Sequence, residues 1–421
     1  MTATESGGFR NMIAMFLPGI FLLGFNIGTG SVTTMAKAGA DYGMTLLWTV
    51  LLSCLATYAM IVVYGRYTLV TGETALQAFR KHIHPAVGIF FVIALTAGVS
   101  GGVMGVMGII ADISFEWSKS FISGGIAPIY WAAFYIGLVY YIFWNGRTEV
   151  FERTLAVIVG IMAASFVLNF FILMPPAVDI ALGFIPSVPE AAGAEGSGEG
   201  SMLLIASMVG TTLSSAIFII RTTLVKEAGW TIAHDRQQRR DAMFAVVMMF
   251  VISASIMAAA AGTLYVEGLG LDQPSQMISL LEPLAGSFAV AIFAIGIIAA
   301  GVSSQFPNVL LLPWLLCDYQ NSPRDMTLPK YRIMVLGISL LGLVVPLFEA
   351  RPVFVMIVSQ AFNVVVLPAT VACIFYLGNK RDLMGEYRHG PITNTVLMGI
   401  FIFSLFTGYM ALMGLLGMLG A

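Results

Sequence analysis

Long apolar segments alternate with short polar stretches along almost the whole chain. Each segment has about the length that a helix needs to cross the bilayer core, roughly 20 residues. Ten-residue stretches of alternating polarity, the pattern of membrane strands, are absent, so helices are favoured. The pattern predicts eleven membrane-spanning helices, near residues 12–40, 43–65, 86–111, 126–145, 151–174, 201–229, 241–265, 285–317, 331–349, 352–377 and 393–418.

Two of the predicted helices carry a polar, glycine-bearing interruption. The first is interrupted at Gly28-Thr29-Gly30-Ser31, and the sixth at residues 210–215 (GTTLSS). Because the interruptions are five helices apart, they indicate two five-helix repeats, and an odd number of helices per repeat inverts the second repeat in the membrane. Matching breaks in the two halves are the best sequence indication of a transporter binding site.

We therefore predict an all-α polytopic membrane protein with a single transmembrane domain over residues 1–421. Repeat one spans about 12–174, repeat two about 201–377, and an additional helix about 393–418. The composition agrees: 58% of the residues are hydrophobic and 10% are charged, with a mean hydropathy of +0.91. A soluble protein carries roughly a quarter charged residues.

Other sequence features exclude several kinds of site. Cys54, Cys317 and Cys373 are far apart in or beside apolar segments, which predicts neither a disulfide framework nor a thiolate metal site. The N-terminus lacks the basic region and cleavage site of a signal peptide, so we expect the first helix to be retained.

Lysine and arginine set the predicted orientation. With a cytoplasmic N-terminus, 17 of the 20 basic residues fall inside, and only Lys37, Lys119 and Arg351 fall outside. Residues 175–200 contain four acidic residues and no basic residue, as expected of an outer loop. An odd number of helices then places the C-terminus outside a bacterial-type plasma (inner) membrane.

The two breaks form the predicted substrate site. Unwound backbone frees N–H and carbonyl groups that must find partners inside the bilayer, while glycine permits the unwinding and Ser and Thr add hydroxyls. The alternative is close helix packing by small residues, which is how we interpret Gly101–Gly108 (GGVMGVMG). The predicted substrate-binding residues are Gly28, Thr29, Gly30, Ser31, Thr211, Ser214 and Ser215.

Four other residues are candidates for ion coupling or for the vestibules. Lys37 follows the first break and Arg221 the second. Each either extends its charge to the membrane surface or influences which charge enters the site. Ser303 and Ser304, in the eighth segment, either hydrogen-bond to their own helix or complete a sodium site with carbonyls of the first break.

The chain resembles the NRAMP family of proton-coupled divalent-metal transporters over almost its whole length. Four stretches carry the resemblance in the family's order: PGIFLLGFNIGTGSVTTMAKAGADYGMTLLW, GSMLLIASMVGTTLSSAIFIIRTTLVKEAG, FAIGIIAAGVSSQ and KRDLMGEY. The resemblance implies a LeuT-type 5+5 inverted repeat with broken helices 1 and 6 and a cytoplasmic N-terminus. It also implies secondary-active transport of a divalent metal ion.

The positions that bind metal in the family hold other residues here. The family's Asp-Pro-Gly-Asn motif corresponds to Gly28–Ser31, and its Met-Pro-His motif to Ser214–Ala216. The family's third-helix acids correspond to Gly102 and Gly105, and Arg221 stands where a second family His often lies. The family's metal-ligand positions are Gly28, Ser31 and Ser214. Because a dehydrated transition metal normally needs a carboxylate ligand, we expect a degenerate metal site that admits a largely hydrated ion.

Three hypotheses follow. The first is a transporter of divalent metal ions by alternating access. The alternative is an ion-coupled transporter of a small carboxylate-bearing organic solute, with Na⁺ bound at Ser303 or Ser304, because the small residues enlarge the cavity and half-helix N-termini attract anions. A further alternative is a non-transporting membrane sensor.

An enzyme is not expected, since we find no nucleophile–base pair and no acid at either break. We expect no cofactor and no nucleic-acid partner. The expected partners are a small solute or ion and the lipid bilayer, and the sequence does not set the oligomeric state.

Overall fold

The computed structural model describes residues 27–119, 121–146, 148–189, 200–281 and 289–419, and their regular structure is entirely helical. Residues 12–26 of the first predicted helix, the acidic tract 190–199 and the first residues of the eighth predicted helix, 285–288, lie outside the described residues.

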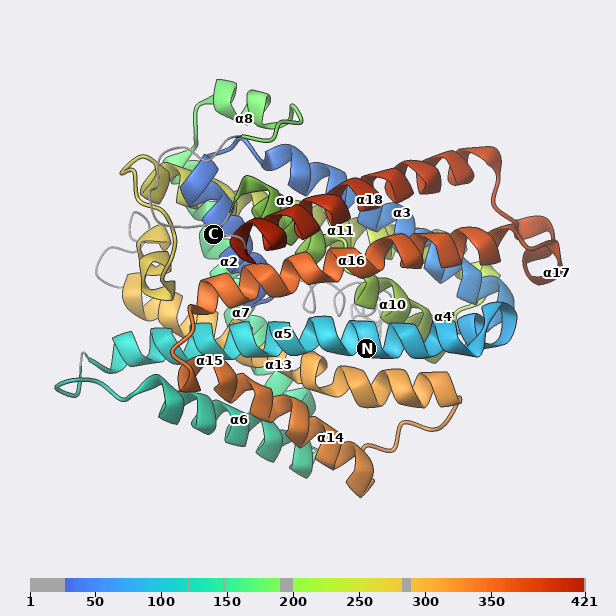
Figure 1. Ribbon diagram of the computed structural model, residues 1–421, viewed down its shortest axis with the longest axis horizontal. Coiled ribbons are helices and arrows are strands. Elements are labelled where there is room, and N and C mark those ends of the chain that lie inside the picture. Colours follow the sequence, from blue (N-terminus) through green and yellow to red (C-terminus); the bar gives the residue numbers. More distant parts are fainter. Residues whose placement is uncertain (1–26, 120, 147, 190–199, 282–288, 420–421) are drawn as a thin grey trace, which may run out of the picture.

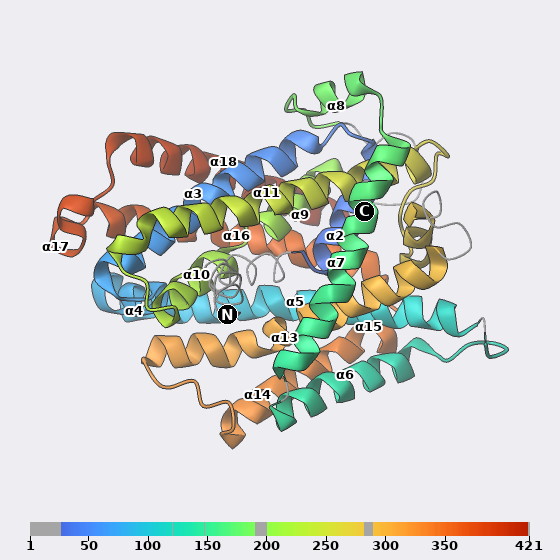
Figure 2. The ribbon, with the colours of Figure 1, turned by 180° about the vertical axis from the view of Figure 1, so that it is seen from behind.

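The long helices run roughly side by side in Figure 1, while Figure 2 shows α7 crossing them at a steep angle. The helices of 12 or more residues are α2 (Thr29–Tyr42), α3 (Leu47–Thr71), α5 (Pro85–Ser118), α6 (Pro128–Asn145), α7 (Thr148–Leu173), α9 (Ser201–Thr212), α10 (Ser215–Glu227), α11 (Asp235–Ala260), α13 (Ala289–Gln320), α14 (Pro329–Leu340), α16 (Pro352–Asn379) and α18 (Pro391–Leu419). Shorter elements join them: α4 (Ala75–Ala78), η1 (Phe79–Ile83), α8 (Ala177–Gly183), η2 (Ile232–His234), η3 (Ala261–Tyr265), η4 (Pro274–Leu281), η6 (Leu341–Leu343), α15 (Val344–Leu347), α17 (Arg381–Met384) and η7 (Gly385–Tyr387).

Among the described residues, eight helices are long and apolar enough to cross a membrane. They correspond to eight of the eleven predicted segments, and the apolar stretch Gly160–Leu173 of α7 is shorter. The all-helical membrane fold is thus confirmed, whereas the count of eleven spans stays a prediction.

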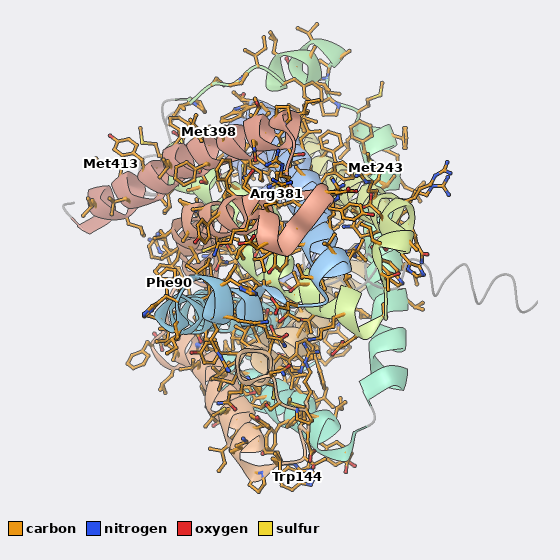
Figure 3. All side chains as sticks on the ribbon, turned by 90° about the vertical axis from the view of Figure 1, so that its right-hand side faces the viewer. Phe90, Trp144, Met243, Arg381, Met398 and Met413 are labelled. Carbon is orange, nitrogen blue, oxygen red and sulfur yellow. The ribbon has the colours of Figure 1, made fainter. Side chains whose placement is uncertain are left out.

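The outer surface of the bundle is apolar, as expected of a lipid-facing perimeter. Seen from the end that carries α17, Phe90, Met243 and Met398 lie on this perimeter, whereas Arg381 lies at the end of the bundle (Figure 3). The three apolar side chains are all exposed. In water such exposure would promote aggregation, but in a bilayer these side chains contact lipid tails.

The basic elements lie at one end of the bundle. In Figure 1, α4 and α17 lie at the same end, and the connection between α5 and α6 at the other. Arg80 and Lys81 follow α4, and Arg381 is the first residue of α17. The α5–α6 connection begins with Lys119. Segments that the sequence assigns to opposite sides of the membrane thus lie at opposite ends of the bundle, and the orientation in the membrane stays a prediction.

The sixth segment is broken between α9 and α10. Only Leu213 and Ser214 leave the helical conformation, with Ser214 extended at φ −80° and ψ 127°. The predicted break over residues 210–215 is therefore too wide, because glycine and hydroxyl residues readily occupy helix ends. The hydroxyl of Thr57 in α3 donates to the Thr212 carbonyl at 3.0 Å, so one carbonyl freed by the break is satisfied inside the protein.

In the described part of the first segment, Ile27 and Gly28 are not helical. Gly28 is extended, at φ −106° and ψ −172°, and α2 begins at the next residue. The prediction that Thr29, Gly30 and Ser31 are unwound is wrong: they form the first turn of α2. Val32 N–H donates to the Gly28 carbonyl at 3.1 Å, which closes that turn.

The loop before α18 contains a buried histidine. His389 donates its backbone N–H to the Gly378 carbonyl at 2.9 Å, and its ring covers Gly378, where a Cβ would overlap it. Burial, together with the nearby Arg66 charge, lowers the pKa of His389 to about 4.

This histidine predicts a loss of stability in acid. Protonation is harder in the folded than in the unfolded protein, so His389 stabilises the fold fully above pH 6.5, and this is lost as the pH falls towards 4. The loss is on the order of 3 kcal/mol. We expect the melting temperature to fall more steeply between pH 7 and 5 in the wild type than in His389→Gln. Equal slopes would contradict this role.

Candidate functional site

A small cavity lies where the two broken segments meet α5, α13 and α16. Its volume is about 60 Å³, enough for roughly four or five water molecules. The residues that line it are Gly28, Gly30, Ser31, Gly98, Val99, Gly102, Val106, Thr211, Ser214, Ser304, Asn308, Gln360 and Asn363.

Uncharged oxygen groups dominate the cavity wall. Hydroxyls come from α2 (Ser31), from the end of α9 and the break (Thr211, Ser214) and from α13 (Ser304). The carboxamides are Asn308 of α13 and Gln360 and Asn363 of α16. None of the described lining residues is charged, and no cluster of three His, Cys, Asp or Glu side chains suited to a metal occurs within the described parts of the chain. The described part of the cavity wall therefore offers neutral ligands.

Glycines bring the elements close enough for these polar groups to converge. A Cβ on Gly28 would lie 2.8 Å from Ser304 Cβ, and a Cβ on Gly30 would lie 2.8 Å from Gln360 Nε2. A Cβ on Gly210 would overlap the backbone carbonyl of Gln360, so α9 touches α16 directly. These close approaches place the breaks against the polar side chains of α13 and α16.

The structure brings six of the eleven sequence candidates to the cavity. Gly28, Gly30, Ser31, Thr211, Ser214 and Ser304 line it. Ser303 is not among the lining residues. Thr29 and Ser215, the other two candidates near the breaks that do not line the cavity, have hydrogen-bond partners elsewhere. The Thr29 hydroxyl donates to the Ile297 carbonyl at 3.5 Å, and the Ser215 hydroxyl accepts from Thr370 at 2.7 Å.

Ser304 has a hydrogen bond within its own helix. Its hydroxyl donates to the Gly301 carbonyl at 3.1 Å, which agrees with one of the two interpretations of this serine. Ser304 also lines the cavity, and the sodium site at this serine stays a prediction.

The side chain of Lys37 is buried in the protein. Its side chain is only 1% exposed, and Nζ lies 3.0 Å from Asp41 Oδ2 and 3.2 Å from Asp272 Oδ1. It also donates to the Leu271 carbonyl at 3.1 Å. Of the two interpretations of Lys37, the one in which its charge extends to the surface is wrong, because these oxygens neutralise it inside the protein. There it joins α2 to the loop before η4.

Arg221 is likewise buried. It forms an ion pair with Asp241 of α11, and both side chains are fully buried. The guanidinium also donates to the Gln238 carbonyl at 3.3 Å and lies over the Trp230 ring. The surface interpretation of Arg221 is therefore wrong, and its charge, matched by Asp241, does not line the cavity.

Sequence reasoning missed Asn308, Gln360 and Asn363. A detectable signal existed, because carboxamides inside apolar membrane segments are uncommon and usually functional. What the sequence could not show is which face of each helix turns towards the breaks.

A family profile described as Natural resistance-associated macrophage protein-like matches residues 20–414. The chain belongs to the Nramp family. This confirms the resemblance found in the sequence. Among its relatives is the divalent metal cation transporter MntH of Acidiphilium cryptum, 23% identical over 406 residues, which are 93% of this chain and 88% of that protein. The MntH of Deinococcus radiodurans is 21% identical over 391 residues, covering 90% and 84% of the two chains.

Solved structures agree on the fold of this Nramp protein. A single-residue mutant of the Eremococcus coleocola manganese transporter aligns with a TM-score of 0.75 at 14% identity, over 98% of this chain and 88% of that one. The inward-facing transporter Mhp1 aligns with a TM-score of 0.56 at 16% identity, over 96% and 90%. The LeuT-type fold is thus confirmed. Nramp proteins are transporters, so the prediction that the chain is not an enzyme is also confirmed.

Proposed function

We propose that this Nramp protein is a secondary-active transporter that carries a small divalent cation by alternating access and binds it in the cavity between the broken segments. The relatives named as divalent metal cation transporters support the cargo. The observation that carries the proposal is the cavity itself, where hydroxyl and carboxamide oxygens from four helices converge on the breaks. The C-terminal end of α9 adds the partial negative charge of its carbonyls, which favours a cation.

The neutral wall implies that the cation keeps part of its water shell. Full dehydration of a dication would have to be offset by charged ligands, and no carboxylate lies among the described lining residues. When water binds the metal, the protein makes hydrogen bonds to that water instead of direct bonds to the metal. Hydroxyls and carboxamides make such hydrogen bonds well. The volume of about 60 Å³ has room for a few such waters. Compared with the metal-binding motifs of the family, such a site is degenerate, because the charged ligand positions hold neutral residues.

The break between α9 and α10 is a suitable hinge. Two non-helical residues, Leu213 and Ser214, separate the half-helices, so each half can tilt without breaking hydrogen bonds of the other. The two non-helical residues therefore support alternating access, in which the outer and inner paths to the cavity open in turn.

The membrane arrangement is also a proposal. The 17-to-3 distribution of basic residues supports a cytoplasmic N-terminus and, with eleven helices, an outer C-terminus in a bacterial inner membrane. The matching breaks support one domain of two inverted repeats and an additional helix.

One observation favours the rival cargo. The N-terminus of α2 begins at the cavity, after a Gly28 with no side-chain cap, and such ends attract carboxylates. The carboxylate of a small organic solute, transported together with Na⁺, would bind at this helix N-terminus. Against this, about 60 Å³ is far below the roughly 300–1,000 Å³ of typical organic-ligand pockets.

Uptake into proteoliposomes tests the proposal. Mg²⁺ and Mn²⁺ are offered with imposed pH and Na⁺ gradients in turn, and the E. coleocola manganese transporter is the positive control. We expect saturable uptake in which Mg²⁺, the more strongly hydrated ion, competes at least as well as Mn²⁺. No cation uptake alongside a working control would contradict the proposal and lead to a screen of small carboxylates with Na⁺.

A further inference from the structure

Asn363 of α16 occupies a space that only a glycine leaves open. A Cβ on Gly98 of α5 would overlap Asn363 Oδ1. Both residues line the cavity, and the carboxamide oxygen packs against the bare α5 backbone at Gly98. Any other residue at position 98 would force this side chain to move.

The orientation of the Asn363 carboxamide is fixed by its neighbour. Asn363 Nδ2 donates to Gln360 Oε1 at 3.2 Å, one turn earlier on α16. Gln360 Nε2 in turn donates to Met356 Sδ at 3.4 Å. With its NH₂ group engaged by Gln360, Asn363 presents its oxygen, the end that attracts cations, on the side of Gly98.

We propose that Asn363 is a specificity-determining residue and that Gly98 is its positioning residue. This inference rests on the proposed cation transport. The Asn363 oxygen is a strong neutral acceptor for the water shell of an incoming cation. It would therefore select for an ion that retains its water and against one that must bind protein ligands directly.

The isosteric change Asn363→Asp separates these two classes of ion. It adds a negative charge at nearly constant shape and supplies an inner-sphere ligand. Mn²⁺ gives up its water more readily than Mg²⁺, which dehydrates reluctantly. The added carboxylate should therefore favour Mn²⁺ over Mg²⁺.

The experiment measures Vmax/KM for Mg²⁺ and Mn²⁺ in proteoliposomes. We expect Asn363→Asp to shift the Mn²⁺/Mg²⁺ ratio at least tenfold towards Mn²⁺. We expect Asn363→Ala and Gly98→Ala each to lower Mg²⁺ uptake about tenfold. In an Asn363→Ala background Gly98→Ala should cost less than twofold, because the overlapping oxygen is gone. Gly137→Ala, whose Cβ would meet nothing within 4 Å, is the matched control.

The cation-dependent rise in melting temperature gives a second, transport-independent measure of the same ratio. If the wild type transports but Asn363→Asp leaves the ratio unchanged, or if Gly98→Ala is equally harmful in the Asn363→Ala background, the role of Asn363 is overturned while the proposed function stands. If the wild type binds both cations without transporting them, the proposed function fails and the ratio from binding still decides the inference. If it neither binds nor transports them, both are overturned.

Discussion

Arg221→Met is expected to lower the free energy of unfolding by about 3–5 kcal/mol, because removing one member of a buried ion pair leaves the other charge uncompensated. The partner, Asp241, is fully buried, and α10 and α11 are joined here by both this pair and the Gln238 carbonyl. Purified protein should show a markedly lower melting temperature or fail to accumulate in the membrane.

The double variant Arg221→Met with Asp241→Leu is the control for this loss. Replacing both charges by apolar side chains of similar size is often neutral for stability, so most of the lost stability should return. A double variant as unstable as the single one would show that the ion pair does not explain the effect.

Gly28→Leu and Gly30→Leu are each expected to abolish cation uptake while leaving the protein folded. Already a Cβ at these positions would crowd Ser304 or Gln360, at 2.8 Å in each case, and the rest of a leucine side chain would extend into the cavity of about 60 Å³. The cavity can absorb part of the added volume, so the loss should be one of transport. Uptake and size-exclusion profiles of the same preparations separate the two effects.

The matched control is Gly137→Leu in α6, where an added Cβ would meet nothing within 4 Å. It should retain uptake. Normal uptake by both Gly28→Leu and Gly30→Leu would mean that the first break serves helix packing and that the site is elsewhere.

The sequence predicted the fold and the half of the candidate cavity that the breaks form. The bilayer requires long apolar helices and biases Lys and Arg to one side of the membrane. Both features can therefore be identified in a single sequence. The breaks could be found because glycines and hydroxyl residues interrupt two apolar segments in matching places. The width of each break could not be predicted, because Thr29 and Thr212 are compatible with a helix end as well as with unwound backbone.

The other half of the site depends on tertiary packing. Gln360 and Asn363 reach the cavity only because α16 lies against α5 and α9. The charges show the same limit. Asp41, one turn from Lys37, was available as a partner from helical spacing alone, but Asp272 is 235 residues away. The error about Lys37 and Arg221 was to treat each charge by itself.

The most direct test of the central claim is an anomalous-scattering map of the protein at a Mn²⁺ concentration that saturates uptake. We predict one peak in the cavity, bordered by Ser31, Ser214, Gln360 and Asn363, with at least some protein oxygens well beyond the roughly 2.1 Å of a direct bond to a small dication, because water lies between. A peak only elsewhere, such as at Asp41 and Asp272, or no peak in the cavity, would contradict the account.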